Sequence, residues 1–307
     1  MDATTDARSF RWIYAKLVLT ALFWGGTFIA GRVAADDVGP FSGAFLRFAV
    51  ASVILVLVLA VRERESLRVP LGELPRLILL GLFGTVLYNV FFFKGLQTVS
   101  AGRASIIVAL NPALIALCSA IFLRERMTGS RVLGVVLSLS GAMTVISRGD
   151  FLTLLGGGVA AGDLCVLGCV GSWVAFTMIG RKTMDRLTPL AMVTWSAVVG
   201  TAGLAVMAFR EGLATHVGHY PVEVWLGTAY LAVFGTVLGF VWFYQGVKAL
   251  GPTRAGVFIN FVPASSVFLG ILLLGEKPTS SLVGGLLLVT AGVYLSNRRG
   301  HVPTQAG

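Results

Sequence analysis

Charged residues are scarce in this chain of 307 residues. They make up 12% of the sequence, against about 25% in ordinary soluble domains. Only 14 residues are acidic, and those near the apolar stretches, such as Asp163, Glu125 and Glu276, fall at their ends. A charged surface for a large soluble domain is therefore lacking. A proton relay or cation site built on clustered carboxylates within the membrane is not expected either.

Histidine and cysteine are equally rare, with 3 of each. The cysteines fall inside apolar stretches and the histidines in loops or the tail: Cys118, Cys165, Cys169, His216, His219 and His301. The sequence contains no H-E-x-x-H, no G-x-S-x-G and no paired carboxylates, so an intramembrane enzyme is disfavoured. We expect no catalytic residue, no metal and no cofactor.

Apolar residues are what the chain has in abundance. They make up 56% of it, and the mean hydropathy is +0.86. A membrane span needs about 20 apolar residues, and backbone groups without water must bond within their own segment, so each span is predicted to be a helix. Ten spans are predicted, at about 14–35, 40–61, 74–96, 102–123, 130–147, 158–180, 189–209, 222–246, 253–275 and 280–297. The fold class is therefore an all-α integral membrane protein.

The sequence repeats itself. Residues 84–141 align without a gap on 235–292 at an offset of 151, and upstream matches such as Trp24/Trp173 follow at 149. We therefore predict two homologous halves, 12–148 and 158–298, flanked by cytoplasmic tails 1–11 and 299–307. Five spans per half would invert the second copy relative to the first. Inverted repeats are typical of secondary transporters, whose substrate site lies at the repeat interface near mid-membrane.

The net charge of +10 points to topology rather than to nucleic acid. One predicted side of the membrane carries Arg8, Arg11, Lys16, Arg62, Arg64, Arg68, Arg76, Arg124, Arg126, Arg131, Arg181, Lys182, Arg186, Lys248, Arg254, Arg298 and Arg299. The other carries Arg32, Lys94, Arg103, Arg148, Arg210 and Lys277. The first side has seventeen basic residues and the second has six. The side with more basic residues, which carries both termini, is therefore predicted to be cytoplasmic. Membrane lipid is the expected partner of this charge.

Arg47 is the one basic residue within the predicted spans that is assigned to neither side. It lies seven residues after Pro40, or roughly 10 Å along a helix. Its counterpart in the second half is Ser196, so the repeat itself does not require the charge. Two interpretations stay open: a snorkelling or helix-pairing arginine, or one that holds a substrate carboxylate or a gating contact.

Matched prolines interrupt one span in each half. Pro112 and Pro263 each remove a helical hydrogen bond near mid-span, with Asn111 and Asn260 close by. Kinks at corresponding positions of inverted repeats indicate a binding site, although a plain packing kink is also common. We interpret the prolines as hinges and the asparagines as hydrogen-bonding groups at the site.

Aromatic side chains supply the other candidate contacts. Trp24 and Trp173 occupy matched mid-span places, and each carries an N–H that needs a partner. Thr27 and Thr177 follow on the same helix faces. The candidate cavity lining comprises Trp24, Phe28, Tyr88, Phe92, Trp173, Phe176, Phe240 and Tyr244.

Glycines seven residues apart predict a seam between the halves. Gly134 and Gly141 share one face of their helix, and Gly285 and Gly292 repeat the pattern. Small residues let membrane helices approach closely. In the links before these helices, Glu125 and Glu276 are interpreted as structural, and Thr128 and Thr279 as N-caps.

Taken together, these segments resemble the drug/metabolite transporter superfamily of the EamA type. The resemblance rests on LFWGGTFIAGR, on P-x-x-x-A-x-x-R from Pro40 to Arg47, and on the two long matched runs that contain NPALIAL and FVPASSV. It implies ten helices in two inverted five-helix halves around a central cavity. Within the superfamily the chain is similar to the YddG-like exporters of aromatic amino acids. It departs from four-helix multidrug relatives, in which a glutamate on the first helix carries proton coupling, because the first span here has no acid.

The resulting expectation is an inner-membrane, multi-pass transporter that functions as a monomer. It would export small amphipathic metabolites, amino acids including aromatic ones among them, by alternating access. A multidrug exporter of the same superfamily is the main alternative, and an intramembrane enzyme or a channel fits the sequence less well.

The charge asymmetry yields a topology prediction. Reporters fused to either terminus should be active if they work in the cytoplasm and silent if they need the periplasm, because basic residues are retained inside. Fusions active only in the periplasm would overturn this orientation.

Overall fold

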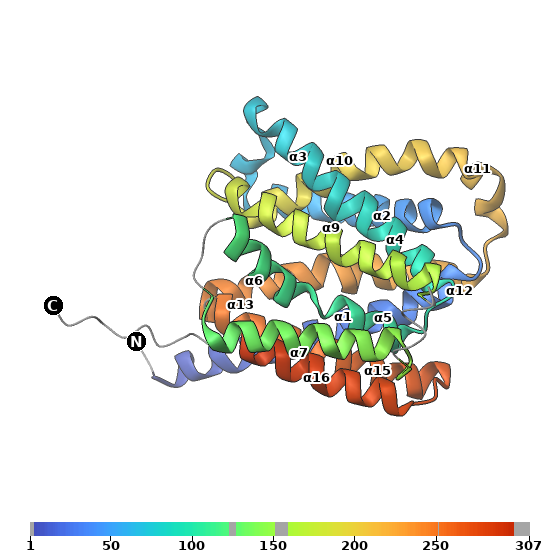
Figure 1. Ribbon diagram of the computed structural model, residues 1–307. Helices are drawn as coiled ribbons and strands as arrows, with labels where there is room; N and C mark the ends of the chain where they lie inside the picture. Colours follow the sequence, from blue (N-terminus) through green and yellow to red (C-terminus); the bar gives the residue numbers. More distant parts are fainter. Residues whose placement is uncertain (1–2, 123–126, 151–158, 251, 298–307) are drawn as a thin grey trace.

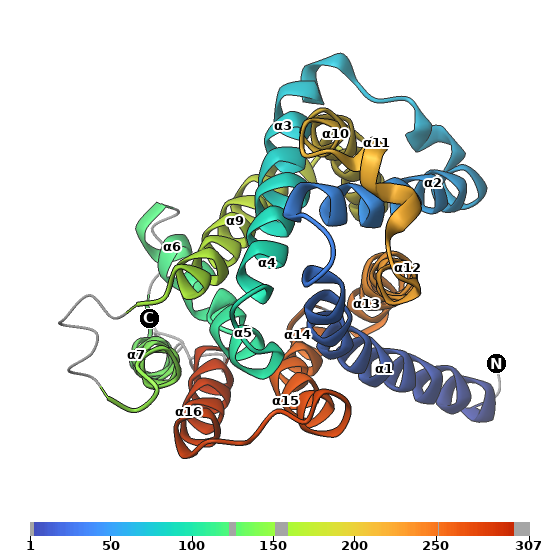
Figure 2. The ribbon, with the colours of Figure 1, turned by 90° about the vertical axis from the view of Figure 1, so that its right-hand side faces the viewer.

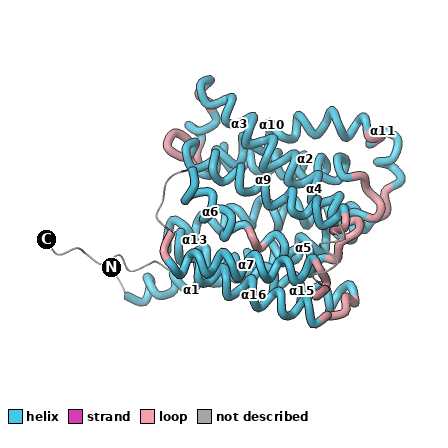
Figure 3. The backbone as a smooth tube through the Cα atoms, in the orientation of Figure 1, coloured by secondary structure: helices cyan, strands magenta, loops and turns pink. Residues whose placement is uncertain are grey.

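The computed structural model describes residues 3–122, 127–150, 159–250 and 252–297. Throughout these ranges the chain forms helices joined by short connections, and they contain no strand (Figure 1, Figure 3). We call the two predicted halves the first and second matched segments. The first forms α1 (Ala3–Ala35), α2 (Pro40–Arg62), α3 (Leu74–Leu80), the π-helix η3 (Gly81–Leu87), α4 (Tyr88–Leu96), α5 (Ala101–Val108), α6 (Asn111–Phe122) and α7 (Gly129–Ile146).

The second matched segment repeats this order. It forms α9 (Ala161–Thr183), α10 (Pro189–Arg210), α12 (Val222–Tyr230), the π-helix η5 (Leu231–Leu238), α13 (Gly239–Leu250), α14 (Pro252–Ile259), α15 (Phe261–Leu274) and α16 (Ser280–Asn297). Short helical turns occur in the connections: η1 (Arg64–Leu67), η2 (Leu71–Glu73), α11 (Leu213–His216) and η4 (Val217–His219).

Eight helical stretches in the described ranges are long and apolar enough to cross a membrane. The remaining two predicted spans contain the shorter apolar helices Phe261–Leu274 and Ser280–Ser296, so the count of ten stays a prediction. The N-terminal boundary differs from expectation, since α1 begins at Ala3 within the expected tail. A helix can continue into water past its apolar segment, and apolar patterning marks only where that segment starts.

The predicted glycine seam is confirmed. Helices α7 and α16 lie side by side in both views (Figure 1, Figure 2). A Cβ on Gly134 would lie 2.5 Å from the carbonyl oxygen of Gly292, and one on Gly141 would lie 2.8 Å from that of Gly285. From the first contact to the second, the residue number increases along α7 and decreases along α16, so the two helices run antiparallel.

A second pairing, between α2 and α10, also joins matched positions. The hydroxyls of Ser52 and Thr201, which the offset of 149 relates, are 3.0 Å apart. At one end of this pair, the Glu211 carboxylate accepts the backbone N–H of Ser42 at 2.7 Å. At the other end, the hydroxyl of Thr188 donates to Glu63. The pair is therefore tied at both ends.

Glu276 has the structural role expected of it. Gly275 ends α15 at a φ of +64°, a left-handed turn that suits glycine. The Glu276 carboxylate then accepts the backbone N–H of Ala101 at 2.7 Å and of Gly102 at 3.1 Å, at the start of α5. The N-caps Thr128 and Thr279 are confirmed by the bonds they accept from Arg131 N and Leu282 N, whereas Glu125 lies outside the described residues.

The matched prolines do more than kink their helices. The first of the two spans breaks at 109–110 between α5 and α6, and the second breaks at Asn260 between α14 and α15. Pro112 and Pro263 then occupy the first turns of α6 and α15. Proline is well accommodated there because the missing N–H would have no helical partner in any case. Whether the breaks act as hinges stays a prediction.

The seam generates a stability prediction. Gly141→Leu or Gly292→Leu should destabilise the fold by about 1–3 kcal/mol, the usual cost of overpacking, because backbone atoms of the partner helix block the new side chain. Thermal unfolding of the purified protein measures the effect. Gly284→Leu on α16 is the matched control, since a Cβ there meets nothing within 4 Å; equal melting of all three variants would contradict the seam.

Candidate substrate site

All eight candidate rings join one continuous cluster. Phe28 lies edge-on to Phe92 with ring centroids 5.5 Å apart, and Phe92 stacks on Tyr88 at 6.3 Å. Tyr88 then contacts Trp173 at 5.6 Å. The rings involved come from α1, α4 and α9, so both matched segments contribute.

The cluster continues from Trp173 into α13. Trp173 stacks on Phe176 at 5.4 Å and on Phe240 at 6.3 Å. Phe240 in turn contacts Trp24 at 5.7 Å and Tyr244 at 6.4 Å. Members on one helix are three or four residues apart and therefore share a face. The sequence had paired only Trp24 and Trp173 by repeat position, and both contact Phe240 in the structure.

Two glycines allow these rings to approach the backbone closely. A Cβ on Gly84 would collide with the Phe176 ring, and one on Gly239 would collide with the indole nitrogen of Trp24. Gly84 lies within η3 and Gly239 directly follows η5, so the ring packing depends on small residues at both π-helices.

The two π-helices occupy matched positions. The offset of 151 carries 81–87 onto 232–238, and both contain the sequence GTVL. π-Helical turns are rare and frequently occur at functional sites. Sequence reasoning used this identity as a sign of repetition and missed the π geometry.

Three candidate residues converge on Gly235 and Thr236 of η5. The Trp24 indole N–H donates to the Gly235 carbonyl at 2.9 Å. A Cβ on Gly235 would lie 2.6 Å from the Thr27 methyl carbon. Arg47 Nε donates to the Thr236 hydroxyl at 3.2 Å. The indole of Trp24 therefore has the partner it was expected to need, and that partner lies in the other matched segment.

Arg47 also contacts the first π-helix, through Asn89. Its Nη1 donates to Asn89 Oδ1 at 2.9 Å, and Asn89 Nδ2 donates to the carbonyls of Thr85 at 2.9 Å and Gly84 at 3.2 Å. Arg47 is buried and joins η3 to η5, which fits the helix-pairing interpretation and not the snorkelling one. Asn89 and Thr236 contact the candidate residue Arg47 and were missed by the sequence analysis; their place in or beside the GTVL repeats was the available signal.

The remaining candidates lie in less connected positions. Thr27 and Thr177 donate their hydroxyl protons to the backbone carbonyls of Trp24 and Trp173 on their own helices. Asn111 is at the break between α5 and α6, and its Oδ1 is buried without a hydrogen-bond partner. Asn260 lies at the corresponding break. Among the described residues, no hydrogen bond joins either asparagine to the ring cluster.

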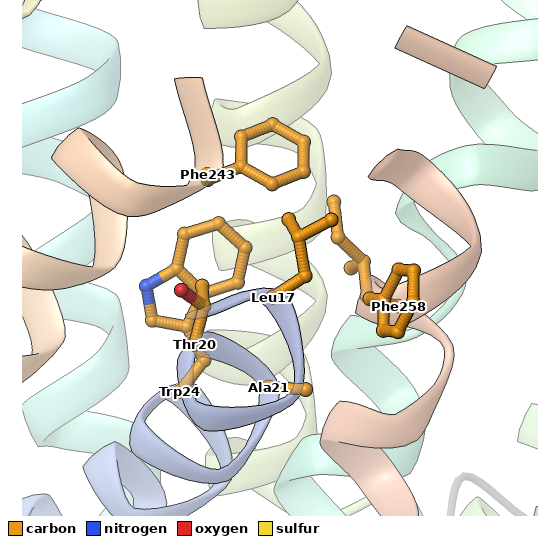
Figure 4. A pocket seen from close by; sticks show the side chains of 7 residues that line it. Leu17, Thr20, Ala21, Trp24, Phe243 and Phe258 are labelled. Atoms are coloured by element: carbon orange, nitrogen blue, oxygen red, sulfur yellow. The ribbon is translucent and has the colours of Figure 1, made fainter. Parts of the chain in front are cut away.

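A narrow crevice adjoins the cluster. Figure 4 shows Thr20 and Trp24 of α1 together with Phe243 and Phe258, which also line it. The crevice holds about 140 Å³ of space in total, but no point in it is wide enough for a water molecule. The Thr20 hydroxyl oxygen is buried without a partner. The side chains that line the crevice must therefore move apart before it can admit a molecule.

Comparison with known proteins defines the class. The EamA-like transporter family matches residues 11–147 and again residues 160–298. With several long apolar helices, the chain is a multi-pass membrane protein of the transporter class. It belongs to the EamA-like transporter family, within the drug/metabolite transporter superfamily.

Similar proteins cover nearly the whole chain. An uncharacterized transporter of Bacillus subtilis, YyaM, is 29% identical over 95% of both chains. A probable terminal-alkyne amino-acid exporter of Streptantibioticus cattleyicolor is 31% identical over 92% of both chains. A crystal structure with 20% sequence identity aligns with a TM-score of 0.63 over 93% of this chain and 96% of that one, which shows the shared fold.

The contact between Trp24 and η5 yields a prediction. Trp24→Phe keeps a ring but removes the N–H that satisfies the Gly235 carbonyl, so stability should fall by about 1–3 kcal/mol, the cost of an unsatisfied buried group. Thermal unfolding of the purified variant tests this. Trp12→Phe on the same helix is the control, because Trp12 is 68% exposed; an equal effect of both substitutions would argue against the bond.

Proposed function

We propose that this protein exports small amphipathic metabolites, aromatic amino acids among them, across the cell's inner membrane. It would do so by alternating access, as a monomer with ten spans in two inverted five-helix halves, 12–148 and 158–298, and with both termini in the cytoplasm. The observation that carries the proposal is the ring cluster, to which four elements from the two matched segments each contribute two rings.

Alternating access fits this geometry because the cluster lies where the two segments meet. Opening toward one side and then the other would part the rings of α1 and α13 from those of α4 and α9. In this proposal Pro112 and Pro263 mark the breaks at which the helices bend. Asn111, Asn260, Thr27 and Thr177 offer hydrogen bonds to the cargo, and membrane lipid surrounds the outer helix faces.

The apolar rings suit an apolar or aromatic side chain, since each buried CH₂ contributes roughly 0.8 kcal/mol. A lipophilic cation suits the centre poorly, because a buried cation needs a fixed opposite charge. The acidic residues in the described ranges lie in connections or in first turns, as Asp163 and Glu223 do. This disfavours the multidrug alternative. The amino-acid exporter among the relatives supports the cargo class proposed here.

Transport in proteoliposomes tests the proposal. Labelled phenylalanine and leucine should enter with saturable kinetics and show counterflow, whereas a quaternary ammonium compound should not. Transport of the cation without amino-acid flux would refute the proposed cargo, and flux without saturation or counterflow would indicate a channel.

A substitution pair localises the site. Trp173→Ala should weaken apparent affinity about 2- to 10-fold, because aromatic contacts contribute about 0.5–1.5 kcal/mol each. Trp225→Ala should have little effect, since Trp225 is 42% exposed on α12 and lies outside the cluster. Flux should be normalised to folded protein, and equal losses for both variants would contradict the location.

A further inference from the structure

Arg47 differs from the other buried charges of the molecule. Three charged side chains are buried in the described part of the chain: Arg47 at 7% exposure, Glu73 at 0% and Asp163 at 1%. Glu73 forms ion pairs with Arg76 and Arg186, and Asp163 with Arg103. Arg47 has no carboxylate within ion-pair distance among the described residues, so its charge is uncompensated.

The guanidinium also has donors to spare. Arginine carries five N–H donors, and Arg47 uses one on Thr236 and one on Asn89, both of them neutral partners. Its outer face lies over the Phe48 ring, 5.3 Å from the centroid. Nη2 makes no hydrogen bond within the described ranges and faces Gly235, where a Cβ would lie 3.7 Å away.

A charge in this position is costly unless something neutralises it. The counterpart Ser196 shows that the repeated architecture forms without an arginine here, because Thr85 simply donates to the Ser196 carbonyl at 3.4 Å. The planar guanidinium fork matches a carboxylate and binds it through two parallel hydrogen bonds. The unused donors therefore have the chemistry of a carboxylate site.

The surroundings place an apolar body beside that site. Trp24 and Thr27 meet the same residue, Gly235, that Nη2 faces, and Trp24 belongs to the ring cluster. On the described ring-bearing helices, the acidic residues lie ten or more residues from any ring of the cluster, so none lies beside a ring on its own helix to receive an ammonium group.

We propose that Arg47 supplies the counter-charge for a carboxylate on the transported molecule, and that the site accepts aromatic carboxylate anions without requiring an ammonium group. This inference rests on the proposed function and narrows its substrate class. Arg47 then acts as a specificity determinant: unloaded, it pins η3 to η5 through Asn89 and Thr236, and loaded, it also holds the carboxylate.

Two probes of nearly the same shape isolate the charge. 3-Phenylpropionate and 3-phenylpropanamide differ in carrying a carboxylate or a neutral amide. Ligand-dependent melting of the purified full-length protein should show that the acid binds about 10- to 100-fold tighter, because hydrogen bonds to charged groups are the stronger ones. Phenylalanine should bind no tighter than 3-phenylpropionate, and phenethylamine should not bind.

Variants separate a binding role from a structural one. Arg47→Gln should bring the acid-to-amide ratio close to 1, and Arg47→Lys should retain part of it. Lys94→Gln, which removes one exposed charge from α4, should keep the full ratio. An Arg47→Gln protein that melts earlier but keeps the ratio would make Arg47 purely structural and overturn the proposal.

The remaining outcomes are decisive as well. If Arg47→Gln does not fold, the wild-type ratio and the Arg47→Lys ratio decide. A wild type that binds acid and amide equally, or that binds neither probe, overturns the assignment. Phenylalanine flux in proteoliposomes without an acid preference would leave the proposed function standing while this inference fails. An acid preference without any amino-acid flux would support the role of Arg47 but refute amino acids as the cargo.

Discussion

The constraint on which this structure depends is that backbone polar groups inside a membrane must find partners within the protein. Regular helices meet it by themselves, but the π-helices η3 and η5 alter the bonding ladder. Side chains supply the compensation there: Asn89 donates to the carbonyls of Gly84 and Thr85, and Trp24 donates to that of Gly235. Asn89 also accepts a hydrogen bond from Arg47, and Trp24 bonds Gly235, the residue that Arg47 Nη2 approaches.

Repetition and asymmetry have separate roles in the molecule. Matched glycines form the seam between α7 and α16, and the matched pair Ser52 and Thr201 joins α2 to α10. These contacts build a frame that both segments share. The chemistry departs from the repeat: Arg47 corresponds to Ser196, and Tyr88 to Gly239. A binding site with one polar end and one aromatic end requires the two segments to differ at these positions. Two identical segments would form two identical ends.

The sequence sufficed for features that depend on composition or repetition. Apolar stretches located the helices, and the spacing of Gly134 and Gly141 located the seam. It did not suffice where tertiary contacts decide the local structure. The sequences of η3 and η5 are apolar apart from one threonine each, so their pattern does not distinguish a π-helix from an α-helix. The role of Asn89 was also missed, because its burial is explained only by the carbonyls and the guanidinium that it contacts in the folded structure.

The distribution of close contacts also constrains how the proposed transport cycle can proceed. Backbone atoms of α7 and α16 touch at the glycines, and α2 and α10 are tied at both ends through Glu211 and Glu63. Displacement along either pairing would meet immediate collisions or break several bonds. The rings of α1 and α4, and those of α9 and α13, meet through side chains, which can part without breaking backbone bonds. In the proposed cycle the rings of α1 and α13 would therefore part from those of α4 and α9, while the two antiparallel pairings keep the halves together.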